Sequence, residues 1–429
     1  MLAAFAAVLP RLGDLGTRTN EVLILWGIAH VAYLVAAFHA LRAPAAATSS
    51  RSLAWILGVA LVARLLLIPT APTLSEDAYR YLWDGSLVRD GINPYVHAPS
   101  DPALADRRNE LFTHLNHADV PTIYPPAAQL FFGAVAAVRA TPATLKGAYL
   151  PVEIAAWLAL LALLRRRGLA SERILLFAWN PLVLVESYGS GHVDLLAAAA
   201  LVLALALIEA GRRVPAGVAW AMACLCKYTP LLLGPTLVRT RAWAILVSAG
   251  LTMAVLALPF LNAGPAIFHG LEAYAAHWEF NGPLFPVLRT VLHSGDAARL
   301  VLAALLVAAV IAISLRAKTA SGAALGCLMA YLLASPTVFP WYLVPLAALL
   351  PLHPNAGVLA ATGLVALSYL PLPHYRATGD WALPKWIPWV EYGGCALVAG
   401  AAWLRARAVA SPAASQERRE AWATESPPT

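Results

Sequence analysis

Apolar runs close to the length of a membrane-spanning helix recur along the whole chain. About 20 such residues are needed to cross the ~30 Å hydrocarbon core of a bilayer. The runs are rich in Leu, Ala and Val and lack the alternating pattern of an outer-membrane β-barrel. Only 12% of the 429 residues are charged, about half the share of a soluble domain. The sequence therefore predicts an all-α integral membrane protein, a polytopic bundle of about a dozen transmembrane helices.

Several of the expected spans are shorter than a full crossing or are broken by proline. Short helices occur at membrane depth only where protein covers them or where they line a cavity. The spans are expected near 22–42, 52–70, 127–140, 143–164, 172–188, 192–210, 214–227, 229–238, 242–261, 299–315, 320–335, 338–352, 357–372 and 388–406. We expect one polytopic domain over residues 1–410, without a cleaved signal, and a disordered polar tail over 411–429.

Basic residues flank the spans and predict their orientation, because cytoplasmic loops carry an excess of Lys and Arg. The expected cytoplasmic clusters are Arg42 and Arg51, Arg165-Arg166-Arg167, Arg212-Arg213, Arg239 and Arg241, Arg316 and Lys318, and Arg405 and Arg407. The large loops 71–126 and 262–297 then face outward from the cell (inner) membrane, and the C-terminus is cytoplasmic. The stretch 127–164 fits this alternation if it makes a single net crossing, with one segment dipping into the membrane or lying flat.

The most polar part of the first outer loop is an acidic, aromatic stretch that begins at Ser75. It is expected to form an interfacial helix over 75–89, with Ser75 as its N-cap and Glu76 and Asp77 in its first turn. Two adjacent carboxylates raise each other's pKa and suit a general base. An alternative without a catalytic role is that both carboxylates only cap a surface helix.

Other polar segments are expected on the same outer face. Tyr124 precedes a double proline that starts the next helix, and a Gly-rich turn over 186–194 contains His192 and Asp194. Lys227 lies between two short spans and could neutralise a phosphate. Each also has an ordinary explanation: an aromatic-belt residue for Tyr124, a capped turn for Asp194, and a snorkelling side chain for Lys227.

No metal or cofactor is expected. The pair His114-x-x-His117 lacks a nearby third ligand at suitable spacing, and the four cysteines fall within apolar runs without zinc spacing. The sequence also lacks a Walker-type loop and a Gly-rich dinucleotide turn. Nothing in it therefore favours nucleotide use on the cytoplasmic side.

Taken in order along the chain, these segments resemble the GT-C superfamily of polytopic glycosyltransferases. They are most similar to bacterial polyprenyl-phosphate-mannose-dependent mannosyltransferases, including glycosyltransferase family 87. The segments that carry the resemblance are Ser75-Glu76-Asp77, Gly91-Ile92-Asn93-Pro94-Tyr95, Tyr124-Pro125-Pro126, Gly191-His192-Val193-Asp194, Lys227, and Ser335-Pro336 with Pro340-Trp341-Tyr342. Two departures are the Glu76-Asp77 order and Val193, where related enzymes often have Asn.

The resemblance implies that Asp77 matches the family's catalytic aspartate and that the donor is a lipid-linked monosaccharide. Asp77, preceded by Glu76, would then accept a proton from the acceptor hydroxyl, which attacks a polyprenyl-phosphate sugar with inversion. Lys227 is the first choice to neutralise the lipid phosphate, assisted by Arg80 or by the turn that carries His192 and Asp194, with Tyr124 in the same site. The acceptor would be a glycan, a glycolipid or a protein.

Two other classes of protein remain open from the residues alone. A transporter or lipid flippase would use Asp77, His192 and Lys227 to couple or bind its substrate, but usually with polar residues at the bilayer midplane. A membrane scaffold would not require acidic, basic and aromatic residues to converge on one side. Their expected gathering at one face favours the glycosyltransferase.

Overall fold

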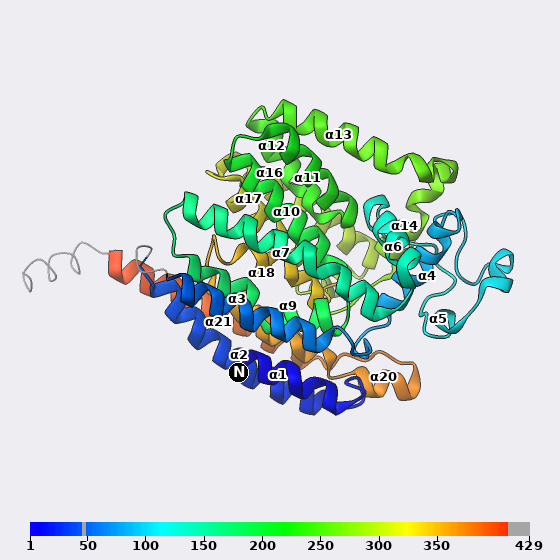
Figure 1. The fold of residues 1–429 in the computed structure, drawn as a ribbon, viewed down its shortest axis with the longest axis horizontal. Helices are drawn as coiled ribbons and strands as arrows, with labels where there is room; N and C mark the ends of the chain where they lie inside the picture. The colour runs from blue at the N-terminus through cyan, green and yellow to red at the C-terminus, as the bar shows by residue number, and fades with distance from the viewer. Residues whose placement is uncertain (45–48, 411–429) are drawn as a thin grey trace, which may run out of the picture.

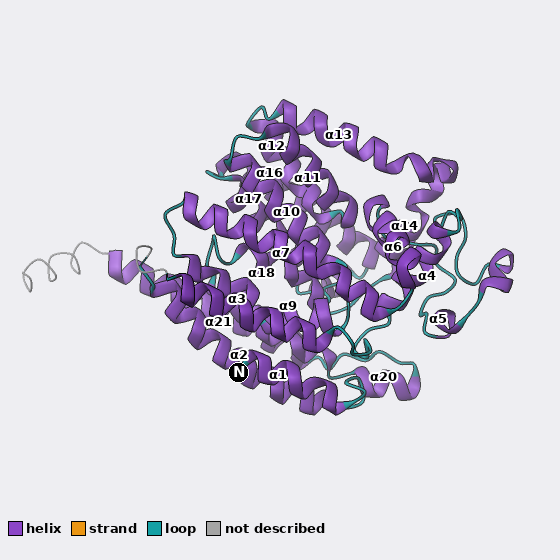
Figure 2. Ribbon diagram, in the orientation of Figure 1, coloured by secondary structure: helices purple, strands orange, loops and turns teal. Residues whose placement is uncertain are grey.

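The structure of the protein is a computed structural model, which describes residues 1–44 and 49–410. The described residues form helices joined by loops (Figures 1 and 2), with only two isolated β-bridges, at Phe280 and Asn281 opposite Thr337. The predicted tail 411–429 lies outside them. The helices of the first half are α1 (Leu2–Val8), α2 (Thr19–Arg42), α3 (Ser50–Leu67), α4 (Asp77–Arg89), α5 (Glu110–Thr113), α6 (Pro126–Arg139), α7 (Pro142–Arg166), α8 (Leu175–Ala178), α9 (Pro181–Leu184), α10 (Asp194–Glu209) and α11 (Arg213–Cys226). Those of the second half are α12 (Gly234–Arg239), α13 (Trp243–Ala257), α14 (His269–His277), α15 (Phe285–Leu292), α16 (Gly295–Arg316), α17 (Ala320–Ala334), α18 (Val344–Leu349), α19 (Ala356–Leu364), α20 (Leu372–Thr378) and α21 (Trp386–Ala410).

The described residues include six helical segments that are long and apolar enough to cross a membrane, which confirms the predicted polytopic fold. These segments are Thr19–Arg42, Ser50–Leu67, Pro142–Arg166, Trp243–His277, Gly295–Arg316 and Ala356–Thr378. Shorter apolar helices accompany them, among them α6, α11 and α17. The expected mixture of full and short spans is therefore present. The helix α21 covers the expected span 388–406 but is not one of the six.

The helices α4 and α6 approach each other closely through glycine. A Cβ atom at Gly85 would lie 2.3 Å from the carbonyl oxygen of Phe132, and one at Gly133 would lie 2.8 Å from Val88. Most side chains of α4 are buried, including Arg80, Trp83 and Asp84. The predicted interfacial helix is therefore held on several sides by protein, and it begins two residues later than expected. The N-cap residue is Glu76 and not the predicted Ser75, so only Asp77 lies in the first turn. Ser75 Oγ accepts a hydrogen bond from the Asp77 N–H (3.2 Å) just before the helix.

Two buried basic side chains hold the chain that leads into α4 in place. Arg64 of α3 makes a two-pronged ion pair with Glu153 of α7, at 3.0 and 2.7 Å, and both side chains are fully buried. Lys146 of α7 donates to the carbonyls of Leu67 and Thr70, at 2.9 and 2.6 Å, just where α3 ends. A charge inside an apolar bundle is tolerated when it is paired or hydrogen-bonded. These contacts anchor the segment that precedes Asp77.

The basic ends of several spans lie together. Arg167, which follows α7, forms an ion pair with Glu209 at the end of α10 and donates to the Ser321 hydroxyl (2.6 Å) at the start of α17. Arg239 at the end of α12 donates to the carbonyl of Ala317 after α16 (2.9 Å). The elements α4, α5, α14 and α20 gather at the other end of the bundle, on the right of Figure 1. The protein thus has one basic end and one end that carries the long polar loops.

Candidate active site

A cavity of about 1200 Å³ opens among α4, α14, α16 and the loops around them. Five residues that the sequence singles out line it: Glu76, Asp77, Arg80, Tyr124 and Lys227. The other two, His192 and Asp194, are both 1% exposed and lie directly behind its wall, against Asp77 and Lys227 respectively. The structure therefore brings all seven candidate residues into one cluster.

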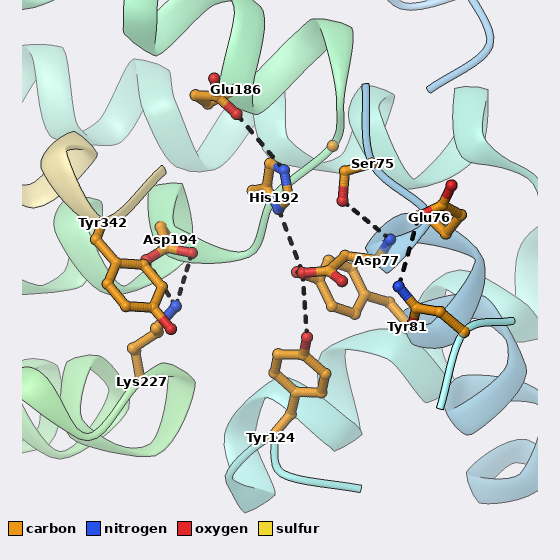
Figure 3. Close-up of polar contacts among 12 residues, drawn as sticks. Ser75, Glu76, Asp77, Tyr81, Tyr124, Glu186, His192, Asp194, Lys227 and Tyr342 are labelled. Carbon is orange, nitrogen blue, oxygen red and sulfur yellow. Dashed lines mark hydrogen bonds and ion pairs between the residues drawn. The ribbon is translucent and has the colours of Figure 1, made fainter. Parts of the chain in front are cut away.

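Asp77 lies at the N-terminal end of α4, where a helix stabilises negative charge. Its side chain is 22% exposed. The hydroxyls of Tyr81 and Tyr124 each lie 3.4 Å from its Oδ2 atom, and His192 Nδ1 lies 3.6 Å from the same atom. Figure 3 shows the carboxylate between His192 and Tyr124. Burial alone would raise the pKa of Asp77, but the His192 ring and the Lys227 charge hold it below its usual value. Asp77 is therefore an ionised carboxylate that reaches the cavity.

The pKa of Glu76 is shifted in the opposite direction from that of its neighbour Asp77. Burial, reinforced by the charge of Asp77, raises the pKa of Glu76. Its Oε2 atom is 3.5 Å from the amide nitrogen of Asn116. The prediction that the two carboxylates raise each other's pKa is confirmed for Glu76 and wrong for Asp77. The reason is that His192 and Lys227 lower the pKa of Asp77, whereas the cations near Glu76 do not outweigh burial and Asp77.

His192 follows a turn whose backbone conformation favours glycine. Gly191 has φ +80°, a left-handed conformation that favours glycine, and its carbonyl accepts a hydrogen bond from the Tyr149 hydroxyl (2.8 Å). The His192 ring then stacks on Trp341, with centroids 3.6 Å apart and planes 14° apart. Its Nε2 atom faces Glu186 Oε2 at 3.5 Å. Each edge of the ring therefore meets a carboxylate.

Lys227 is held by a second carboxylate at the cavity wall. It is the C-cap residue of α11, and its ammonium lies 2.9 and 3.0 Å from the two oxygens of Asp194, at the start of α10. The Tyr342 ring lies 4.2 Å from the same nitrogen, a distance typical of a cation–π contact. The Lys227 side chain is 19% exposed and the Asp194 side chain only 2%. The positive charge thus faces the cavity while its counter-charge is buried behind it.

Arg80 has structural partners on two sides. Its Nε atom donates to Asp84, one turn along α4, at 2.9 Å, and its Nη2 atom donates to the Val120 carbonyl at 2.9 Å. Gln129 of α6 also contacts Asp84, at 3.3 Å. Arg80 therefore connects α4 to the loop that closes the cavity, whereas Lys227 projects more freely into it.

The far side of the cavity is aromatic, a feature that the sequence indicated only through the segment 335–342. Its rings are Tyr274, Trp278, Phe280, Tyr331, Phe339, Trp341, Tyr342, Tyr369, Tyr375 and Trp381. Arg299 and Glu279 lie on the same side and form an ion pair (3.2 Å). The histidines His114 and His117 contact different rings, Tyr79 and Trp278. The structure therefore gives these two histidines separate aromatic partners.

Comparison with known proteins identifies one family. The family model described as alpha-(1->6)-mannopyranosyltransferase, N-terminal domain, matches residues 7–244, more than half of the 429 residues. The matched part contains Glu76, Asp77, Arg80, Tyr124, Glu186, His192, Asp194 and Lys227. It ends before all ten rings of the aromatic side of the cavity. A search of curated proteins finds no match to the chain.

Proposed function

Because the chain belongs to the alpha-(1->6)-mannopyranosyltransferase family, it is a membrane glycosyltransferase, and we propose that it uses a polyprenyl-phosphate-mannose donor. The observation that carries this proposal is Asp77, an ionised carboxylate at the wall of a cavity of about 1200 Å³. Sites for single small molecules usually occupy about 300–1,000 Å³. The cavity therefore has room for a donor sugar, its phosphate and an acceptor together.

In the proposed reaction, Asp77 takes the proton of an acceptor hydroxyl. The hydroxyl oxygen then bonds to the anomeric carbon of mannose from the face opposite the lipid phosphate. The bond between that carbon and the phosphate oxygen breaks, and its electron pair leaves with the phosphate, so the configuration inverts. General-base assistance of this kind contributes about 10²–10⁴-fold. The Tyr124 hydroxyl, 3.4 Å from Asp77, would hold the base in place.

The leaving phosphate needs positive charge more than it needs a proton, because its second pKa is about 6. Lys227 is our first choice for that role. An ammonium has three donors, and the two oxygens of Asp194 occupy at most two of them. Arg80 and the turn that carries His192 would assist Lys227. Asp194 would hold Lys227 in place, and Glu76 would add negative charge beside Asp77.

The cavity would face the extracytoplasmic side of the inner membrane. It lies at the end of the bundle that carries the long polar loops, away from the basic residues around Arg167 and Arg239. Positive charge favours the cytoplasmic side. The C-terminal tail would then be cytoplasmic.

The test uses the full chain in nanodiscs with radiolabelled polyprenyl-phosphate-mannose and extracted acceptor glycolipid. Asp77→Asn should abolish the loss of label from the lipid, because an amide cannot take the proton. Asp90→Asn is the matched control: it follows the same helix and pairs with Arg89 and Arg107 at the surface, so transfer should persist.

Transfer that survives Asp77→Asn would overturn the base assignment. Label that stays on the lipid with wild-type protein and every acceptor would overturn the proposed donor. If the intact donor instead crossed the nanodisc or a vesicle bilayer, the protein would be a flippase. A chelator arm tests metal dependence, which we expect to be absent.

A further inference from the structure

Two ion pairs at the cavity have opposite polarity. In the pair Lys227–Asp194 the cation is the more exposed partner, with side-chain exposures of 19% and 2%. In the pair Arg299–Glu279 the carboxylate is the more exposed partner, at 35% against 16% for the guanidinium. Both members of the second pair line the cavity, and the proposed mechanism gives neither of them a role. The first pair therefore suits an anion, whereas the second turns a carboxylate toward the cavity.

The main chain around this exposed carboxylate is held in place by a neighbouring segment. The Phe280 N–H donates to the carbonyl of Pro336 (3.1 Å), and the Phe280 carbonyl accepts a hydrogen bond from the Val338 N–H (2.7 Å). The Thr337 hydroxyl donates to the carbonyl of Trp278 (2.9 Å). Side chains that extend from a fixed backbone bind a ligand more precisely than those of a free loop.

One contact of the Trp278 ring leads to the candidate base. The half-buried ring lines the cavity, and His117 packs against it with the ring centroids 4.6 Å apart. The residue before it, Asn116, donates to Glu76 (3.5 Å), which is next to Asp77 in the sequence. Asn116 and His117 also line the cavity. The two long loops at this end of the molecule therefore meet at Trp278.

A second contact of the Trp278 ring leads to the proposed phosphate ligand. The Tyr274 ring lies 5.5 Å from it, and the hydroxyls of Tyr274 and Tyr342 contact each other. The Tyr342 ring in turn lies 4.2 Å from the ammonium of Lys227. Trp278 is thus linked to both ends of the proposed reaction through short chains of contacts.

The proposed displacement requires the acceptor to approach from the side opposite the phosphate. Figure 3 shows Lys227 and Glu76 on opposite sides of Asp77. With the phosphate at Lys227, the acceptor hydroxyl would reach Asp77 from the side of Glu76, where Asn116 also lies. This side of the cavity is therefore the one available to the acceptor.

The chemistry of this side matches a sugar ring. A pyranose has a face of C–H bonds and a rim of hydroxyls, and an aromatic ring offers a large apolar face to the former. Sugar hydroxyls both donate and accept hydrogen bonds, a carboxylate accepts them, and a guanidinium donates them. The ion pair of Glu279 and Arg299 therefore has partners for both kinds of hydrogen bond. A phosphate would be repelled by the exposed carboxylate of Glu279.

We propose that Trp278, Glu279 and Arg299 bind the sugar ring of the acceptor to which mannose is added. The C–H face of that ring lies against Trp278, and its hydroxyls bind the ion pair. This inference rests on the proposed function. Bound in this way, the acceptor reaches Asp77 from the side away from Lys227. The acceptor is accordingly a glycan and not a protein side chain.

The test measures mannose transfer in nanodiscs to methyl α-mannoside, a soluble acceptor, and to dodecyl α-mannoside, its membrane-anchored counterpart. Trp278→Leu should raise KM for the acceptor about tenfold, because the aromatic face is lost, and should leave KM for the donor unchanged. Glu279→Gln should raise the same constant about three- to tenfold, because the hydrogen bonds lose their charge. Trp278→Tyr keeps an aromatic face and should retain most of the affinity.

Phe268→Leu and Glu272→Gln are the matched controls. Both residues are exposed, precede Trp278 in the same long loop and lie outside the cavity lining, so KM for the acceptor should not change. Saturation-transfer NMR of methyl α-mannoside with Asp77→Asn protein measures acceptor binding without transfer. Adding Trp278→Leu to that protein should weaken the signal, and adding Phe268→Leu should not.

The two mannosides distinguish the sources of the sugar. Transfer to dodecyl α-mannoside alone would identify a membrane glycolipid as the acceptor, and equal transfer to both would identify a free glycan. In either case dependence on Trp278 supports the inference. Transfer to a serine- or threonine-containing peptide, and to neither mannoside, would overturn it.

An unchanged acceptor KM in both Trp278→Leu and Glu279→Gln would also overturn the inference. The same holds if KM for the donor rises as much as KM for the acceptor, because these residues would then act on the fold or on the donor. Failure of the proposed function looks different: wild type would transfer no mannose, or Asp77→Asn would stay active. Active wild type, inactive Asp77→Asn and unchanged acceptor constants would reject only the acceptor site.

Discussion

The two sides of the cavity differ in chemistry and in the part of the chain that builds them. The charged wall consists of Glu76, Asp77, Arg80 and Lys227, all within the residues that match the family. The aromatic wall consists of the ten rings from Tyr274 to Trp381, all beyond residue 244. The family-matched part thus places the proposed reacting groups, while the later part gives the cavity its aromatic lining. Aromatic rings suit this task because they combine large apolar faces with polar edges.

The two walls meet where His192 and Lys227 lie against aromatic rings. His192 stacks on Trp341 at 3.6 Å, and the Lys227 ammonium lies 4.2 Å from Tyr342. Trp341 also stacks on Phe339 at 4.5 Å, and Phe339 stacks on Phe280 at 4.8 Å. A row of rings therefore runs from the later half of the chain to the histidine beside the candidate base. If the charged wall supplies the reacting groups and the aromatic wall lines the cavity, substitutions in the two walls should change different kinetic constants.

The largest effect is expected at Lys227 in the charged wall. Lys227→Met leaves Asp194 buried without its counter-charge, which costs about 3–5 kcal/mol of stability. The double variant Lys227→Met/Asp194→Asn should recover most of that stability but should still bind the donor poorly. Thermal unfolding and donor binding in detergent measure the two effects separately. Lys318→Met, at an exposed position near the basic end, is the control. Wild-type donor affinity in the double variant would reject Lys227 as a phosphate ligand.

An intermediate effect is expected at the point where the walls meet. Trp341→Leu removes the face on which His192 stacks, so kcat should fall by about two- to tenfold. Trp381→Leu changes a ring that contacts Phe280 and Tyr375, away from His192, and should change KM while sparing kcat. Steady-state transfer kinetics distinguish the two. Equal losses of kcat in both variants would break the proposed division between the walls.

The smallest effect is expected on the melting temperature, when the two adjacent carboxylates Glu76 and Asp77 are replaced one at a time. The pKa of Asp77 is lowered by folding, so its stabilising effect is present above its ordinary value of 3.8 and is lost as the pH falls through the folded-state value. The pKa of Glu76 is raised from 4.5, so its ionised form opposes folding above that value. At pH 7, Glu76→Gln should therefore raise Tm by about 1–2 °C, and Asp77→Asn should lower it. Melting curves at pH 7 and pH 4 check both signs, and the two differences should shrink at pH 4. A lower Tm for Glu76→Gln at pH 7 would contradict this assignment.

Much of the site was predictable from the sequence because its groups lie where apolar runs are interrupted. Asp77, His192 and Lys227 interrupt or border such runs, and a charge there is costly enough to indicate a task. The membrane-spanning segments were predictable from the same apolar runs. The exact start of α4 was not predictable, because Ser75 is a typical N-cap residue whereas Glu76 takes that position in the structure.

The remaining groups depend on contacts between distant parts of the chain. Tyr369 meets Glu186 across 183 residues, and Arg64 meets Glu153 across 89. A local sequence pattern shows that such a residue is polar, but it does not show which distant residue is its partner. The lowered pKa of Asp77 has the same origin, because the imidazole and the ammonium that lower it come from other segments. Only the folded chain brings these charges together.

The last described helix is tied to the cavity in a way that bears on how the enzyme is made. Asn281 donates to Glu391 of α21 (2.6 Å) and accepts a hydrogen bond from Tyr392 (2.6 Å). The adjacent residue, Phe280, belongs to the aromatic wall. Since synthesis proceeds from the N-terminus and domains form as the chain emerges, the charged wall can be inserted well before α21 leaves the ribosome. The cavity is completed only when that helix binds Asn281, so we expect the nascent enzyme to acquire activity only after α21 has been synthesised.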